Sequence, residues 1–187
     1  MVYYMFAKDS VVGGLLREGW PGPSVPGSHP GQLVRTLVVD ASQSPSSLVT
    51  WIKKSTPEKI ELLKLLGHGN GGYLALGTGL TASSVAAFTA LRGWFTKDSD
   101  GIEIHACLAA SDIHSVCNRE TRVCIPTPFF TSSRNNGLGY QLLSALAAAA
   151  GVRVKAGINL QYGDNAQMLE GATVTVLPSG SLIHEIP

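Results

Sequence analysis

Short apolar runs recur along this chain, separated by segments with helical periodicity or turn residues. Five of these runs have the length and composition of buried strands: residues 1–7, 33–39, 60–66, 102–104 and 152–158. Two further runs, at 172–177 and 181–186, flank Pro178-Ser179-Gly180 and predict a terminal hairpin. A short extended segment at 73–77 follows Gly72 and predicts a hairpin strand.

Three segments between these strands predict helices. Ser44 and Pro45 suit the N-cap and first position of a helix through residue 54. Thr81 is expected to cap a helix over 82–95, and an Ala- and Leu-rich segment predicts a helix over 137–151. Strands that alternate with helices indicate an α/β fold with three layers, in which helices flank a mainly parallel sheet that ends in a C-terminal hairpin.

The length of 187 residues fits a single domain over residues 1–187. Two long stretches within it lack the pattern of a helix or a central strand. Residues 9–31 are rich in Gly, Pro and Ser, and residues 108–135 are irregular. We expect both stretches to form long surface loops.

Composition excludes several classes of protein. Charged residues make up 14% of the chain and the formal net charge is +1, which argues against nucleic-acid or membrane-surface partners. No apolar run approaches a membrane span, and the N-terminus lacks a signal-peptide pattern, so a cytoplasmic location is expected, with a fragment of a larger exported protein as the alternative. Three cysteines do not make a disulfide framework, although Cys117 and Cys124 could pair and leave Cys107 free.

Two short turns after apolar runs carry the chemistry. Gly67-His68-Gly69 follows the strand at 60–66, and Ala106-Cys107 follows the strand at 102–104. Neighbouring parallel strands deliver such residues to the same edge of a sheet. A thiol and an imidazole that meet there form a candidate nucleophile and general acid/base. The backbone N–H groups of Gly69 and Cys107 could hold the developing oxyanion.

These motifs resemble those of the caspase-like (clan CD) cysteine peptidases, which include caspases, legumains, gingipains, separases and the self-cleaving peptidase domains of bacterial toxins. The shared pattern is an apolar block ending in His-Gly, then an apolar block ending in a small residue and Cys. This chain has it as Leu66-Gly67-His68-Gly69 and Ile104-His105-Ala106-Cys107. The two motifs are somewhat closer than the roughly 50 residues of caspases. The order of later elements is most similar to the toxin domains.

The resemblance implies a cysteine endopeptidase that uses Cys107 and His68, with self-processing as one mode of action. It also implies a substrate-pairing segment at Ile158, Asn159, Leu160 and Gln161, where an extended peptide or protein substrate would add a strand. Asp112 is the nearest acid downstream of Cys107 that could serve a substrate pocket. The toxin domains bind an inositol phosphate in a basic cleft, and no matching Lys/Arg cluster occurs here, so no cofactor is expected.

Two alternatives belong to other classes. The chain could be a caspase-like module that binds peptides without cleaving them. It could also bind zinc, since His105, Cys107, His114, Cys117 and Cys124 lie close in sequence, but they lack the local Cys-x-x-Cys or His-x-x-x-His pairs of zinc sites, so no metal is expected. His105 lies two residues before Cys107 and would share its face on a regular strand, so it could tune the thiol or contact solvent. Oligomeric state and residue preference stay open.

Overall fold

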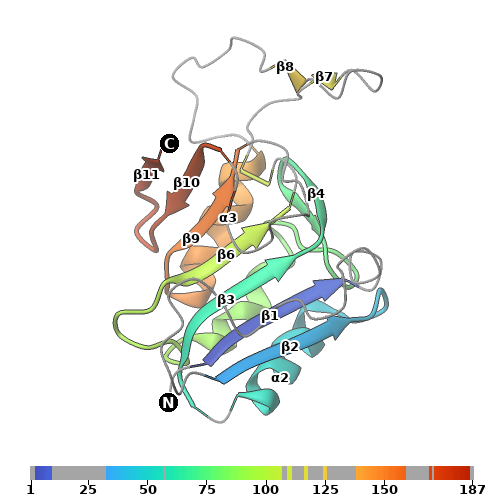
Figure 1. Ribbon diagram of the computed structural model, residues 1–187, viewed down its shortest axis with the longest axis vertical. Coiled ribbons are helices and arrows are strands. Elements are labelled where there is room, and N and C mark those ends of the chain that lie inside the picture. Colours follow the sequence, from blue (N-terminus) through green and yellow to red (C-terminus); the bar gives the residue numbers. More distant parts are fainter. Residues whose placement is uncertain are drawn as a thin grey trace.

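In the computed structural model, a seven-stranded mixed sheet forms the centre of the molecule (Figure 1). The structure describes residues 3–9, 33–56, 58–106, 109–110, 116–117, 124–125, 138–158, 169 and 171–185. The strand order is β11-β10-β9-β6-β3-β1-β2. The strands are β1 (Tyr3–Asp9), β2 (Leu33–Val39), β3 (Ile60–Leu66), β6 (Gly101–His105), β9 (Val154–Gly157), β10 (Thr173–Val176) and β11 (Leu182–Glu185).

The first five strands of this sheet in chain order are parallel, and the last two turn back. β2, β1, β3, β6 and β9 pair in parallel, whereas β10 pairs antiparallel with both β9 and β11. The predicted strands at 33–39 and 60–66 and the terminal hairpin are confirmed. An α/β fold with a mainly parallel sheet is therefore correct.

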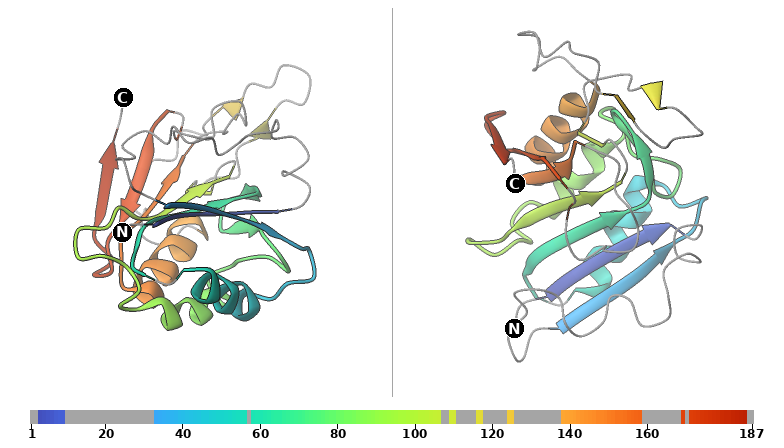
Figure 2. Two further views of the ribbon diagram at one scale, coloured as in Figure 1. Left: turned by 60° about the horizontal axis from the view of Figure 1, so that its bottom comes forward. Right: turned by 45° about the horizontal axis from the view of Figure 1, so that its top comes forward.

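The described helices all cover one face of the sheet (Figure 2, left). They are α2 (Pro45–Ser55), the 3-10 helix η1 (Val85–Leu91) and α3 (Leu138–Ala150). They connect β2 to β3, β3 to β6 and β6 to β9, steps that all advance in the same direction across the sheet. Right-handed crossovers that advance in one direction place their helices on the same face. We expected helices on both faces of the sheet. In the described part of the chain, they form one layer on one face.

The core lies between this helical layer and the sheet. Alternate residues of the central strands, such as Leu63, Leu65, Ile102 and Ile104, point to the helices and are fully buried. Phe88 of η1 and Leu146 of α3 pack in the same cluster. The intervening residues of the strands therefore face the opposite side, which we call the second face.

Local sequence signals explain α2 better than η1. The hydroxyl of Ser44 accepts a hydrogen bond from the N–H of Ser47 (3.2 Å), and Pro45 opens α2, as predicted. The α-helix expected over 82–95 is instead a short 3-10 helix, and Thr81 is not its cap. The hydroxyl of Ser84 hydrogen-bonds to the carbonyls of Gly79 and Thr81, and these bonds stabilise the turn that precedes η1. At the other end, Gly93 with φ +76° ends the helical segment.

Two small hairpins stand apart from the main sheet. β4 (His68–Asn70) pairs with β5 (Tyr73–Ala75), which confirms the predicted hairpin strand after Gly72. β7 (Val116–Cys117) pairs with β8 (Cys124–Ile125), and the register sets residue 117 opposite residue 124. A disulfide between Cys117 and Cys124 stays a prediction. Most of the stretches expected as long loops, 9–31 and 108–135, lie outside the described residues.

Candidate functional site

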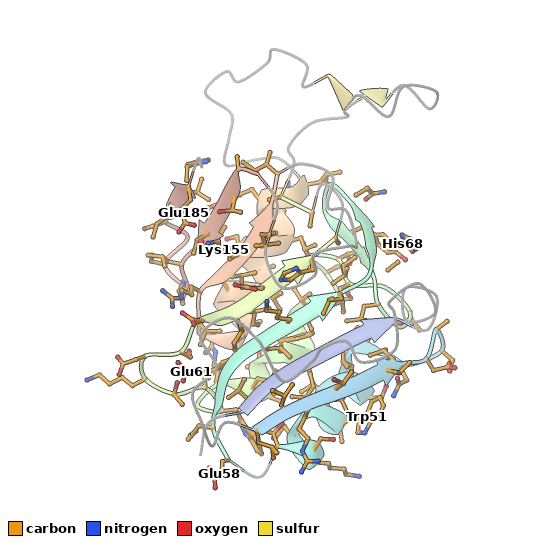
Figure 3. All side chains as sticks on the ribbon, in the orientation of Figure 1. Trp51, Glu58, Glu61, His68, Lys155 and Glu185 are labelled. Carbon is orange, nitrogen blue, oxygen red and sulfur yellow. The ribbon has the colours of Figure 1, made fainter. Side chains whose placement is uncertain are left out.

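His68 lies just beyond the carboxyl end of β3. β3 ends at Leu66, and Gly67 forms the turn that follows. His68 is the first residue of β4 and pairs with Ala75 of β5. Its side chain is exposed at the outer side of this hairpin (Figure 3). Gly69 follows opposite Leu74. The hairpin thus presents an imidazole to solvent directly beside a central strand of the sheet.

The turn before His68 is joined to the end of β6. The N–H of Gly67 donates to the carbonyl of His105 (3.2 Å), and the parallel register places Leu66 beside His105. His105 is the last residue of β6, and the buried Ala106 follows it. The two motif-bearing strand ends are therefore neighbours at one edge of the sheet, as the parallel-strand argument requires. Cys107 itself lies outside the described residues.

The end of β9 lies at the same edge. The carbonyl of Gly157 accepts a hydrogen bond from the N–H of Ala110 (3.2 Å), which connects β9 to the segment after β6. The N–H of Ile158 donates to the carbonyl of Ala172 (3.0 Å), so this donor is already used inside the protein. An extended substrate would therefore have to pair with the other backbone groups of the predicted segment 158–161. Asp112, Asn159, Leu160 and Gln161 lie outside the described residues.

The second face carries a buried polar cluster that the sequence argument missed. We call Lys64, Glu103 and His105 the Lys–Glu–His cluster. Glu103 Oε2 lies 3.2 Å from Lys64 Nζ and 2.9 Å from His105 Nε2. The side chains of Lys64 and His105 are only 3% and 5% exposed. His105 is therefore buried within the fold, so the expectation that it contacts solvent is wrong.

A sequence signal for this cluster exists. Lys64 and Glu103 each interrupt an apolar strand, and both occupy positions out of phase with the residues that face the helices. The parallel register pairs Lys64 directly with Glu103. Charged residues at matched out-of-phase positions of two neighbouring strands therefore indicate a polar contact on the second face. That register depends on the tertiary pairing of β3 with β6, which the sequence alone leaves open.

Burial and charge act in opposite directions on the two acid–base groups. Burial would raise the pKa of Glu103, but the hydrogen bond with His105 and the nearby Lys64 ammonium outweigh it and lower that pKa to about 2. Burial lowers the pKa of His105, against the opposing influence of Glu103. Glu103 is therefore ionised and His105 neutral near neutral pH.

Other kinds of site find no support in the described part of the chain. No three described His, Cys, Asp or Glu residues are placed to share a metal ion, and two of the five residues considered for zinc, Cys107 and His114, lie outside that part. No described helix is long and apolar enough to cross a membrane. Comparisons of the chain with protein-family models, curated proteins and solved structures gave no match.

Proposed function

We propose that this chain is a cysteine endopeptidase of the caspase-like kind, in which Cys107 is the nucleophile and His68 the general acid/base. The observation that carries the proposal is the hydrogen bond from Gly67 N–H to the His105 carbonyl, because it joins the turn before His68 to the strand that leads to Cys107. Cys107 follows His105 by two positions, so their Cα atoms are at most about 7.6 Å apart. The caspase-like layered fold belongs to the same proposal.

The chemistry follows from the two groups. The Cys107 thiolate attacks the carbonyl carbon of a peptide bond, and the N–H groups of Gly69 and Cys107 hold the oxyanion. His68 gives a proton to the departing amine, without which the C–N bond would not break productively. Water then hydrolyses the thioester, and His68 recovers a proton from it. The exposure of His68 gives it access to both substrate and solvent.

The test is cleavage of a mixed peptide library by the purified chain, with products read by mass spectrometry. We expect cleavage that is lost in Cys107→Ala and in His68→Ala and retained in the matched variants Cys117→Ser and His184→Gln. A thiol-reactive probe should label Cys107 faster than Cys117 or Cys124. Retention of peptides without cleavage, with equally slow labelling of all three thiols, would instead support the non-catalytic peptide-binding module.

A further inference from the structure

A groove lies between α2 and η1, which run side by side in the helical layer (Figure 2, left). Its volume of about 470 Å³ is that of a natural ligand site, and it is open to solvent. α2 supplies one wall, which carries two hydroxyl and two ammonium groups. η1 and Trp94, in the turn that follows it, supply the other wall. The polar residues of the first wall are Ser46, Thr50, Lys53 and Lys54.

Small side chains shape the apolar part of the groove. Ala87 and Ala90 of η1 line it, together with the buried Val49 of α2. Because an alanine side chain is a single methyl group, these positions leave room between two packed helices. An apolar side chain of a ligand would therefore meet apolar atoms there.

Trp94 is held in place before any ligand binds. Its N–H donates to the carbonyl of Leu91 (2.9 Å), and its carbonyl accepts from the N–H of Ile60 (2.8 Å). The side chain is partly buried against the core, and Lys53 Nζ lies 5.2 Å from the centre of its ring. A ring fixed in this way loses little conformational freedom on binding.

The charge of the groove is positive. Among the described residues that line it, none is acidic, and neither Lys53 nor Lys54 forms an ion pair in the described part of the chain. Both lysines lie in the last turn of α2. The carbonyls at that helix end carry only about half a negative charge, so the two ammonium groups leave this end of the groove net positive.

We propose that the groove binds an acidic segment of a partner protein, in which carboxylates flank one apolar side chain. The carboxylates pair with the ammonium groups of Lys53 and Lys54, and the apolar side chain packs on Trp94 and the two alanines. An open groove leaves much of a small molecule in water, whereas a peptide that continues along both helices covers more of it. The site uses none of the residues proposed for catalysis, so the inference does not depend on the proposed function.

The experiment titrates the ¹⁵N-labelled chain with the peptide acetyl-Glu-Glu-Leu-Glu-Glu-amide and follows the indole N–H signals by NMR. The signal of Trp94, assigned by its absence in Trp94→Phe, should shift with a dissociation constant of the order of 0.1 mM, since exposed ion pairs each contribute little. In Lys53→Gln/Lys54→Gln, binding should weaken by about tenfold. Lys97→Gln is the matched control, because Lys97 is exposed and does not line the groove, and it should bind as the parent does.

Two further peptides test the same contacts without changing the protein. Acetyl-Gln-Gln-Leu-Gln-Gln-amide, which lacks the carboxylates, and acetyl-Glu-Glu-Gly-Glu-Glu-amide, which lacks the apolar side chain, should both bind more weakly. Equal affinity of the two lysine variants for the acidic peptide would overturn the inference. So would equal affinity for the leucine and glycine peptides, which would mean general attraction of anions. Self-association of the parent that is lost in Lys53→Gln/Lys54→Gln would assign the groove to a second copy of the chain instead.

Discussion

At the scale of single residues, Glu103 makes the stability of the fold depend on pH. Its folded pKa of about 2 lies below its ordinary value, so it contributes stability above about pH 4.5 that is lost as the pH falls toward 2. The lowered pKa of His105 acts in the same direction, because below about pH 6.5 the unfolded chain takes up this proton first. Chemical unfolding measured at several pH values should therefore show stability that rises from acid to neutral pH.

The effect of substitution on stability should distinguish Glu103 from a carboxylate at the surface. Glu103→Gln should lower the free energy of unfolding by about 3 kcal/mol at neutral pH, because it removes the carboxylate that lies 3.2 Å from the buried Lys64 ammonium. The loss should shrink as the pH approaches 2. Glu185→Gln is the matched control, since Glu185 also pairs with a lysine but is 53% exposed, and it should have little effect. Equal effects of the two substitutions would contradict the account of the cluster.

At the scale of elements, the guanidinium of Arg92 connects η1 to the C-terminus of α3. Its Nε and Nη2 donate to the carbonyls of Ala149 (2.9 Å) and Ala148 (2.6 Å). The last carbonyls of a helix lack intrahelical partners and carry partial negative charge, so a cation there both caps the helix and opposes its dipole. Arg92→Ala should lower the free energy of unfolding by about 1 kcal/mol.

A lysine-to-alanine change provides the comparison for Arg92. Lys54 is an exposed residue in the last turn of α2 with no hydrogen bond to another described element, so Lys54→Ala should change stability by only a few tenths of a kcal/mol. Urea unfolding of both variants decides the matter. A loss in Lys54→Ala as large as that in Arg92→Ala would mean that positive charge in general, rather than capping of α3, stabilises this layer.

The elements also show why sequence predicted some features and missed others. The Ser44 cap of α2 and the runs of β2 and β3 are local signals, and each was predicted. The 3-10 form of η1 depends on Ser84 bonding two carbonyls of the preceding turn, a choice that helical periodicity does not encode. The Lys–Glu–His cluster needs β3 and β6 to be neighbours in one register, so only the tertiary fold brings Lys64 to Glu103. Within the candidate site, the neighbouring strand ends were predictable, whereas the burial of His105 was not.

At the scale of the whole molecule, the order of the strands determines where the helices and the candidate site lie. From β2 to β9 each crossover advances the same way, so the helices gather on one face and the carboxyl ends of β3, β6 and β9 share one edge. His68, the end of β6 and Ile158 all lie at that edge. The position of His68 further depends on its hairpin, which lies outside the main sheet and must be held from elsewhere.

That support comes from the beginning of α3, at Gly72. This glycine has φ +80°, and a Cβ placed on it would lie 2.6 Å from the Cβ of Leu138 and 2.7 Å from its carbonyl oxygen. Gly72→Ala should therefore lower the free energy of unfolding by more than the roughly 1 kcal/mol that a left-handed backbone costs alanine. Gly93→Ala is a matched control, because Gly93 has φ +76° but nothing within 4 Å of the added Cβ. Thermal unfolding should show the larger loss in Gly72→Ala, and NMR should show a shift of the His68 ring in that variant alone. Equal losses with an unmoved His68 ring would mean that the hairpin holds its position without α3.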